Sequence, residues 1–231
     1  MNRIQVLQSL LDRQIAPAYL EIGVETGYVL LALKAGRKFA VDPAFKIPWY
    51  RKLRAHFDHR SNRHIEYFEM PSDEFFLKHS DRLSDGLDVV FVDGLHTHEQ
   101  AYRDVVNALP YLKPHGVIVM HDCLPPHAAA ALRADSPQAA EAQGHPGWTG
   151  EWTGDVYKTV MQLRACHDDL EVFTLDCDYG LGVVARGAST QRLEMSLDEI
   201  QQLTYEQFLT RRSDYLNLKE PDFWARWLAD R

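Results

Sequence analysis

Residues Tyr19–Tyr28 read YLEIGVETGY and are followed by a second apolar run at 29–33. Leu20 and Ile22 predict a short buried strand, and the second run predicts a helix. A strand, a glycine turn and a helix in this order form the kind of elbow that holds nucleotides in α/β proteins. Gly23 allows the sharp turn that such an elbow needs. The stretch therefore predicts an α/β fold with a cofactor at its first turn.

The residues of the elbow limit which cofactor it can hold. A dinucleotide site needs glycines at the positions of Gly23, Glu25 and Tyr28, and only the first is present. Glu25 places a carboxylate where a pyrophosphate would contact the backbone. The chain also has no G-x-x-x-x-G-K-[ST] motif, which excludes a P-loop. A ligand without phosphates fits better, and S-adenosylmethionine offers a cationic sulfonium and amine, a ribose diol and an adenine.

An acidic residue follows the next predicted strand. Asp42 comes directly after the short segment 38–41, which is predicted to be a strand, and precedes Pro43. An acid about 20 residues beyond the glycine turn is placed to accept hydrogen bonds from a ribose diol. A turn residue before Pro43 would look the same in the sequence, but its pairing with the elbow favours the ribose role.

Two further acids follow apolar strands. Asp93 comes after the run at 89–92, and Asp122 comes two residues after the run at 117–120. Ligands of open α/β sheets bind at the carboxyl ends of the strands, so we expect both carboxylates at the ligand edge. Such a pair can hold a divalent cation, or it can position a substrate hydroxyl or amine. His96 lies in the turn after Asp93 and is a candidate general base, because imidazole is neutral near pH 7.

Three motifs occur in order along the chain: E-I-G-V-E-T-G, D-V-V-F-V-D-G-L-H-T-H-E-Q and Y-L-K-P-H-G-V-I-V-M-H-D. They resemble motif I and motifs IV to VI of the class I S-adenosylmethionine-dependent methyltransferases. The resemblance is closest to the catechol, caffeoyl-CoA and macrocin-type O-methyltransferases and covers residues 19–185. It implies a Rossmann-like, seven-stranded, mostly parallel sheet with helices on both faces and an antiparallel last strand.

The resemblance also implies roles for individual residues. Asp93 matches the first metal ligand of the metal-dependent members, and Asp122 matches the acid at the end of the next strand, so the implied cation is Mg²⁺ or another divalent ion. His96 matches the histidine base of the macrocin-type enzymes. Cys123 follows Asp122 where the catechol type has asparagine, and a thiol is a poor magnesium ligand, which leaves the metal open. The implied cofactor-binding residues are Glu21, Gly23, Val24, Glu25, Gly27, Asp42, Ser72 and Asp93, although N-capping explains Ser72 equally well.

The segment 124–155 is a long connection rich in Ala, Pro and Gly. Connections of this length in a compact domain usually carry function. It contains Trp-Thr-Gly twice, beginning at Trp148 and at Trp152, and it follows the predicted catalytic edge. We interpret it as a lid on the substrate side, with His121, Trp148 and Trp152 as substrate contacts. The alternative is that the two tryptophans only hold the loop to the domain.

The ends of the chain are predicted to be helical. Ile4–Ile15 has apolar residues at helical spacing. Residues 1–190 are predicted to form the cofactor-binding domain, and 191–231 a helical C-terminal extension. An apolar face on this extension would dock on the domain or join a second subunit in a homo-oligomer; its members are Phe223, Trp224, Trp227 and Leu228.

Composition excludes several classes of protein. The chain has 231 residues and a net charge of −8, which argues against a general nucleic-acid-binding protein. No apolar run reaches the ~18 residues that span a bilayer, and no signal peptide is evident at the start, so we expect no membrane partner. Three cysteines without C-x-x-C spacing indicate a reducing, cytoplasmic setting. His98 and His115 are expected at the surface.

These observations predict an S-adenosylmethionine-dependent methyltransferase acting on a small molecule, at oxygen, with His96 as the base. Transfer to nitrogen without a metal is one alternative, in which the carboxylates would hold an amine. A non-catalytic, cofactor-binding scaffold subunit is another.

Overall fold

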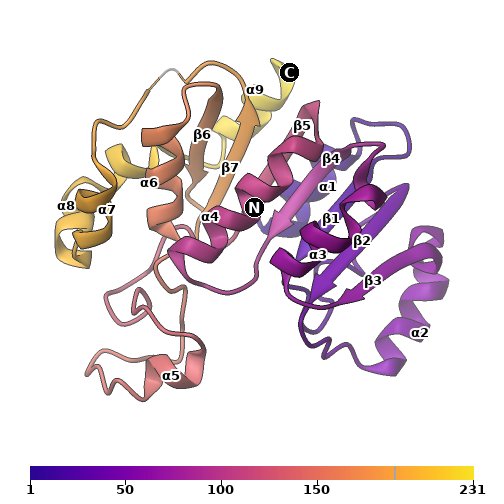
Figure 1. Cartoon of the computed structure of the whole chain (residues 1–231), viewed down its shortest axis with the longest axis horizontal. Helices are drawn as coiled ribbons and strands as arrows, with labels where there is room; N and C mark the ends of the chain where they lie inside the picture. Colours follow the sequence, from indigo (N-terminus) through magenta and orange to yellow (C-terminus); the bar gives the residue numbers. More distant parts are fainter. Residues whose placement is uncertain (190) are drawn as a thin grey trace. The chain divides into compact units, whose positions relative to one another are not determined.

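The computed structural model describes residues 1–189 and 191–231, which fall into two compact units (Figure 1). The first unit comprises residues 1–94 and 103–119, and the second comprises residues 95–102 and 120–231. Each unit contains strands and helices, and each is described by itself below.

The first unit is built on parallel strands. Its strand order is β3-β2-β1-β4-β5, and β1 pairs in parallel with both β2 and β4. Strand β4 is buried at every residue, as expected for a parallel strand covered on both faces. The elements are α1 (Arg3–Leu11), β1 (Ala18–Ile22), β2 (Arg37–Asp42), α2 (Trp49–Asp58), β3 (Ile65–Glu69), α3 (Ser72–His79), β4 (Leu87–Val92) and β5 (Leu112–Met120).

Helix α4 (His98–Ala108) has residues in both units and precedes β5. It begins directly after Thr97 and ends before Pro110. A short 3₁₀ turn, Leu109–Tyr111, takes over where the proline removes a backbone donor.

The second unit contains an antiparallel pair of strands. Strand β6 pairs antiparallel with β7 and parallel with the short β8, in the order β7-β6-β8. Helices precede and follow this group. The elements are α5 (Pro137–Glu141), α6 (Tyr157–Cys166), β6 (Leu170–Leu175), β7 (Leu181–Arg186), α7 (Leu197–Gln202), α8 (Tyr205–Leu216), β8 (Leu218–Lys219) and α9 (Phe223–Ala229).

The predicted fold class is confirmed, with one additional strand. The strands are mostly parallel, and the antiparallel pair comes at the C-terminal end. The described residues contain eight strands instead of seven, because β8 forms within the extension that was predicted to be entirely helical. Asn217, in the left-handed conformation, ends α8 and turns the chain into β8.

The predicted helix after the elbow is wrong. Residues 25–32 form a series of turns. The Lys38 amine donates to the carbonyl oxygens of Leu30 (2.8 Å) and Leu33, which directs these carbonyls toward the side chain.

Two other boundaries also differ. Helix α1 ends at Leu11, so Ile15 is fully exposed beyond it. Strand β5 begins at Leu112, five residues before the apolar run at 117–120.

The apolar face of the C-terminal extension packs within its own unit. The Phe173 ring on β6 contacts Phe223 and Trp227 edge-on, each at 5.3 Å between centroids. The Trp227 indole also donates to Glu171 at 2.9 Å. In this chain the apolar face therefore docks on β6 of its own unit. Among the described residues, no helix is long and apolar enough to cross a membrane.

Replacement of Gly23 by alanine is expected to destabilise the protein strongly. Gly23 has φ +83°, and an added Cβ would lie 2.0 Å from the backbone oxygen of Asp93. Gly144 is the matched control, since it has φ +66° with no atom within 4 Å. Gly144→Ala should cost only the left-handed strain of about 1–2 kcal/mol, whereas Gly23→Ala should cost roughly 1–3 kcal/mol more. Denaturant unfolding measures both, and equal losses would contradict the close approach.

Candidate active site

The elbow of the first unit is held by close backbone packing. Gly23 follows β1 and donates its N–H to the Val41 carbonyl at 2.9 Å. The Asp93 N–H donates to the carbonyl of Ile22 at 2.8 Å. The ends of β1, β2 and β4 are thus joined where Gly23, Asp42 and Asp93 stand, so these three residues lie at one edge of the sheet within this unit.

Asp42 shapes the elbow directly. Its carboxylate accepts hydrogen bonds from the backbone N–H groups of Val24 and Glu25 at 2.8 Å each, and from Ala44 at 2.7 Å. The side chain is buried. Both carboxylate oxygens therefore stabilise the turn itself, and the ribose-binding role stays a prediction. Glu25 points outward at φ +44° and pairs with Lys46 at 3.4 Å.

Glu21 lies in a buried polar cluster that the sequence did not reveal. The Tyr19 hydroxyl donates to its carboxylate at 2.5 Å. Burial raises the pKa of Glu21 from 4.5 to about 8, and burial lowers the pKa of Lys38 from 10.5 to about 8. The Lys38 amine also donates to Asn62 at 2.6 Å. The available signal was a lysine and a glutamate inside two apolar strands, where ionisable residues are rare.

Ser72 and Asp93 make side-chain contacts within the first unit. Ser72 is the first residue of α3, with Pro71 at the cap position, so the predicted capping role of Ser72 is wrong. Its hydroxyl instead donates to the Asp104 carboxylate at 2.6 Å. Asp93 is half-buried and forms an ion pair with Arg3 at 3.3 Å. The cofactor roles of Ser72 and Asp93 stay predictions.

In the second unit, Asp122 lies between two histidines. Its Oδ2 atom is 3.2 Å from His96 Nε2 and 3.1 Å from His121 Nδ1. His121 Nε2 is 3.7 Å from an oxygen of Asp178. Asp122 is buried and has a positive φ of 60°, which is unusual for a residue other than glycine. Unusual backbone of this kind concentrates at functional sites. The predicted base and the predicted second acid thus lie together.

The predicted lid holds His96 in place. His96 Nδ1 lies 3.3 Å from the Trp152 carbonyl oxygen, and the two rings stack with centroids 4.8 Å apart. The Trp152 indole N–H donates to the Leu132 carbonyl at 2.7 Å. Gly154 packs so closely that an added Cβ would lie 1.8 Å from the His96 carbonyl oxygen. Trp148 is half-buried, and its predicted substrate role is untested.

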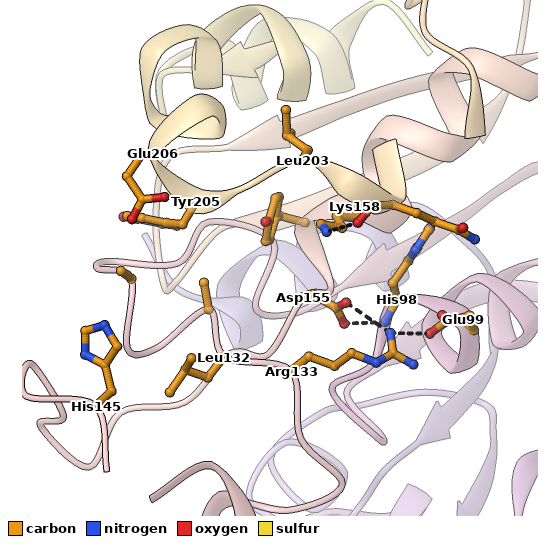
Figure 2. A pocket seen from close by; sticks show the side chains of 14 residues that line it. His98, Glu99, Leu132, Arg133, His145, Asp155, Lys158, Leu203, Tyr205 and Glu206 are labelled. Carbon is orange, nitrogen blue, oxygen red and sulfur yellow. Dashed lines mark hydrogen bonds and ion pairs between the residues drawn. The ribbon is translucent and has the colours of Figure 1, made fainter. Parts of the chain in front are cut away.

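A cavity of about 630 Å³ opens beside these residues in the second unit (Figure 2). Leu132, whose carbonyl binds Trp152, forms part of its wall, but His96 and Asp122 do not. Arg133 spans the cavity wall between Glu99 at 2.7 Å and Asp155 at 3.1 Å (Figure 2).

His98, which was expected at the surface, is buried beside this cavity. The backbone N–H of His98 donates to Asp155 at 2.7 Å at the start of α4. Burial lowers the pKa of the His98 imidazole. Asp155 lies 57 residues along the chain, so only the tertiary structure shows this contact. His115 is exposed, as expected, and contacts Asp88 at 3.0 Å.

Comparison with known proteins agrees with this fold. The family model for a methyltransferase domain matches residues 20–123, which include the elbow, Asp93, His96 and Asp122. A comparison with curated proteins gave no match. The family match agrees with the predicted resemblance to S-adenosylmethionine-dependent methyltransferases over residues 20–123 of the 231-residue chain.

Solved structures share the fold at low sequence identity. The O-methyltransferase TomG from Streptomyces achromogenes, involved in tomaymycin synthesis and in complex with SAM, is 16% identical, with a TM-score of 0.59 and 80% of each chain covered. The O-methyltransferase from Bacillus cereus in complex with SAH is 18% identical, with a TM-score of 0.56, covering 80% of this chain and 82% of that chain. The SAH-bound methyltransferase PaMTH1 from Podospora anserina is 16% identical, with a TM-score of 0.53, covering 79% and 76%.

Replacement of Glu21 by glutamine is expected to change how stability depends on pH. A buried acid with a raised pKa retains its proton in the folded state while the unfolded chain releases it near pH 4.5. The contribution of Glu21 is therefore complete below pH 4.5 and declines as pH rises toward about 8. The decline has a maximum slope of about 1.4 kcal/mol per pH unit.

Chemical unfolding of the unaltered protein and of each variant between pH 4.5 and about 8 measures the effect. Glu21→Gln should flatten the decline, while Glu25→Gln, an exposed matched control in the same elbow, should leave it unchanged. An unaltered slope in Glu21→Gln would show that Glu21 ionises normally.

Proposed function

We propose that the protein transfers a methyl group from S-adenosylmethionine to a hydroxyl oxygen of a small molecule, with His96 as the general base. The observation that carries this proposal is the placement of His96 between the Trp152 carbonyl and the Asp122 carboxylate, at 3.3 and 3.2 Å. A histidine oriented by an oxygen acceptor on one nitrogen and a carboxylate on the other is equipped to move a proton.

The elbow supports S-adenosylmethionine as the methyl donor. Asp42 holds the backbone N–H groups of Val24 and Glu25, so these donors are not available to a phosphate. The exposed Glu25 carboxylate would repel a phosphate but can face a cationic amine or sulfonium. TomG and the Bacillus cereus enzyme, which share the fold, were solved with SAM and SAH.

The reaction is an in-line displacement at a methyl carbon that the sulfonium already activates. The protein therefore contributes orientation of the acceptor and removal of the hydroxyl proton. In our proposal Nδ1 keeps its proton on the Trp152 carbonyl, and the acceptor hydroxyl replaces the contact of Nε2 with Asp122. Nε2 then takes the hydroxyl proton as the C–S bond to the methyl group breaks and the new O–C bond forms, and the nearby Asp122 carboxylate stabilises the imidazolium. Trp152 positions the ring by stacking on it and by accepting from Nδ1.

A divalent cation is the second part of the proposal. The sequence places Asp93 and Asp122 after apolar strands, where they would hold such an ion. In the second unit, two imidazole nitrogens approach one oxygen of Asp122 at 3.1 and 3.2 Å. A carboxylate together with an imidazole suits a divalent first-row metal, so Asp122 and His121 would hold the ion and His96 would remain the base. When bound, the ion would lower the pKa of the acceptor hydroxyl.

His96→Gln is expected to lower kcat by about 10²–10⁴-fold, the usual contribution of a general base. The control is His127→Gln, which removes an imidazole from the segment 124–155, where His127 forms a hydrogen bond with Thr149 at 2.9 Å. A methyl-release assay on hydroxylated small molecules measures turnover, and isothermal titration measures cofactor affinity. The cofactor affinity of His96→Gln should stay normal. Full turnover in His96→Gln would rule out this base.

Treatment with EDTA is expected to lower O-methylation, and added divalent cation should restore it. Calorimetric titration of the cation supplies a readout independent of activity, and Asp122→Asn should weaken cation binding at least about tenfold. Undiminished turnover after EDTA would remove the cation and leave metal-free transfer, to oxygen or nitrogen. Cofactor binding without turnover on a broad panel of hydroxyl and amine acceptors would instead favour a scaffold subunit.

A further inference from the structure

Helix α2 turns its apolar side chains away from the protein. Trp49, Tyr50, Leu53 and Phe57 are 76%, 58%, 52% and 73% exposed. The only buried residue of the helix is Ala55. At 3.6 residues per turn the four apolar residues span an arc of about 100°, and Ala55 lies nearly opposite. A surface helix normally directs its apolar stripe toward the core, so the orientation of α2 is reversed.

Basic residues border this stripe on both sides. Lys52 flanks one edge of the arc, and Arg51 and Arg54 lie beyond the other; all three are exposed. The segment 46–64 contains six Lys or Arg residues and a single acid, Asp58, although the chain as a whole has a net charge of −8. Asp58 pairs with Arg54 at 3.7 Å. The positive charge of the protein is therefore concentrated around its exposed aromatic stripe.

The charge and shape of this surface favour one of three kinds of binding partner: a second copy of the chain, single-stranded nucleic acid or a lipid surface. A symmetric contact between two copies would bring the basic flanks of both α2 helices together, and like charges would oppose it. Sequence-independent binding of single-stranded nucleic acid requires a basic groove that tracks the backbone, and α2 offers the convex side of a helix. Trp, Phe and Leu on one face with Lys and Arg on the flanks is the composition of helices that lie flat in a lipid interface.

We propose that α2 docks the protein on anionic lipid surfaces. Trp49, Leu53 and Phe57 enter the boundary between headgroups and acyl chains, and the flanking Lys and Arg side chains meet lipid phosphates and carboxylates. The ten residues of α2 measure about 15 Å, so the helix lies in the interface and does not cross it. Figure 1 shows α2 at the outer side of β3 within the first unit, and the four apolar side chains of the helix are exposed. This inference departs from the expectation of no membrane partner and does not depend on the proposed reaction.

Co-sedimentation of the full chain with vesicles tests the proposal. The protein should partition onto phosphatidylcholine vesicles that contain phosphatidylserine and much less onto phosphatidylcholine alone. Binding should weaken as salt is raised, because surface attraction is screened. Trp49→Ser/Leu53→Ser/Phe57→Ser and Lys52→Glu/Arg54→Glu should each lower the partition coefficient at least about tenfold.

Leu209→Ser/Arg212→Glu is the matched control. Leu209 and Arg212 are an exposed leucine and an exposed arginine on α8, and the double variant should bind vesicles like the unaltered chain. Circular dichroism and thermal unfolding check that all variants fold. Three results would overturn the proposal: no sedimentation with anionic vesicles, equal sedimentation with neutral ones, or an equal loss in the control. An oligomer of the unaltered chain that dissociates in the triple variant would assign the stripe to self-association instead.

Discussion

The missing Cβ of Gly23 is the constraint on which the first unit depends. The backbone of Gly23 lies against the carbonyl of Asp93, so the tips of β1 and β4 meet without side chains between them. Asp42 then fastens the following turn by accepting the N–H groups of Val24 and Glu25. Gly23, which has no side chain, and the Asp42 carboxylate together fix the shape of the turn at which a cofactor is predicted to bind.

The second unit reaches its geometry by a different route. Its functional residues do not sit on a rigid row of strand tips but are held by loops that cross-link one another. Asp155 takes the first N–H of α4, Trp152 stacks on His96, and Gly154 admits the backbone of His96 at contact distance. The segment around Trp152 is therefore part of the support of His96 and not merely a cover.

The features that the sequence predicted are those with local causes. Apolar runs predicted β1, β4 and β5, and Asp42 and Asp93 lie at strand ends of the first unit because parallel strands end at a common edge. The failures have tertiary causes. Turns replace the predicted helix after the elbow, where the Lys38 amine donates to two carbonyl oxygens. His98 is buried, and its backbone N–H donates to Asp155, 57 positions away. The cluster of Tyr19 and Glu21 was missed because its residues are hidden in strands that read as apolar. The ionisable residues inside these strands were a local signal, but the sequence does not show which groups they contact.

The link between Trp152 and His96 has a consequence for the timing of any reaction at this site. The same residue supplies the ring that stacks on the histidine and the oxygen that fixes its Nδ1. If residues around Trp152 swing outward to admit a molecule, the imidazole loses both restraints at once. In the proposed reaction, exposure to bulk water and readiness of His96 to accept a proton would then exclude each other, and the methyl donor would be protected from hydrolysis.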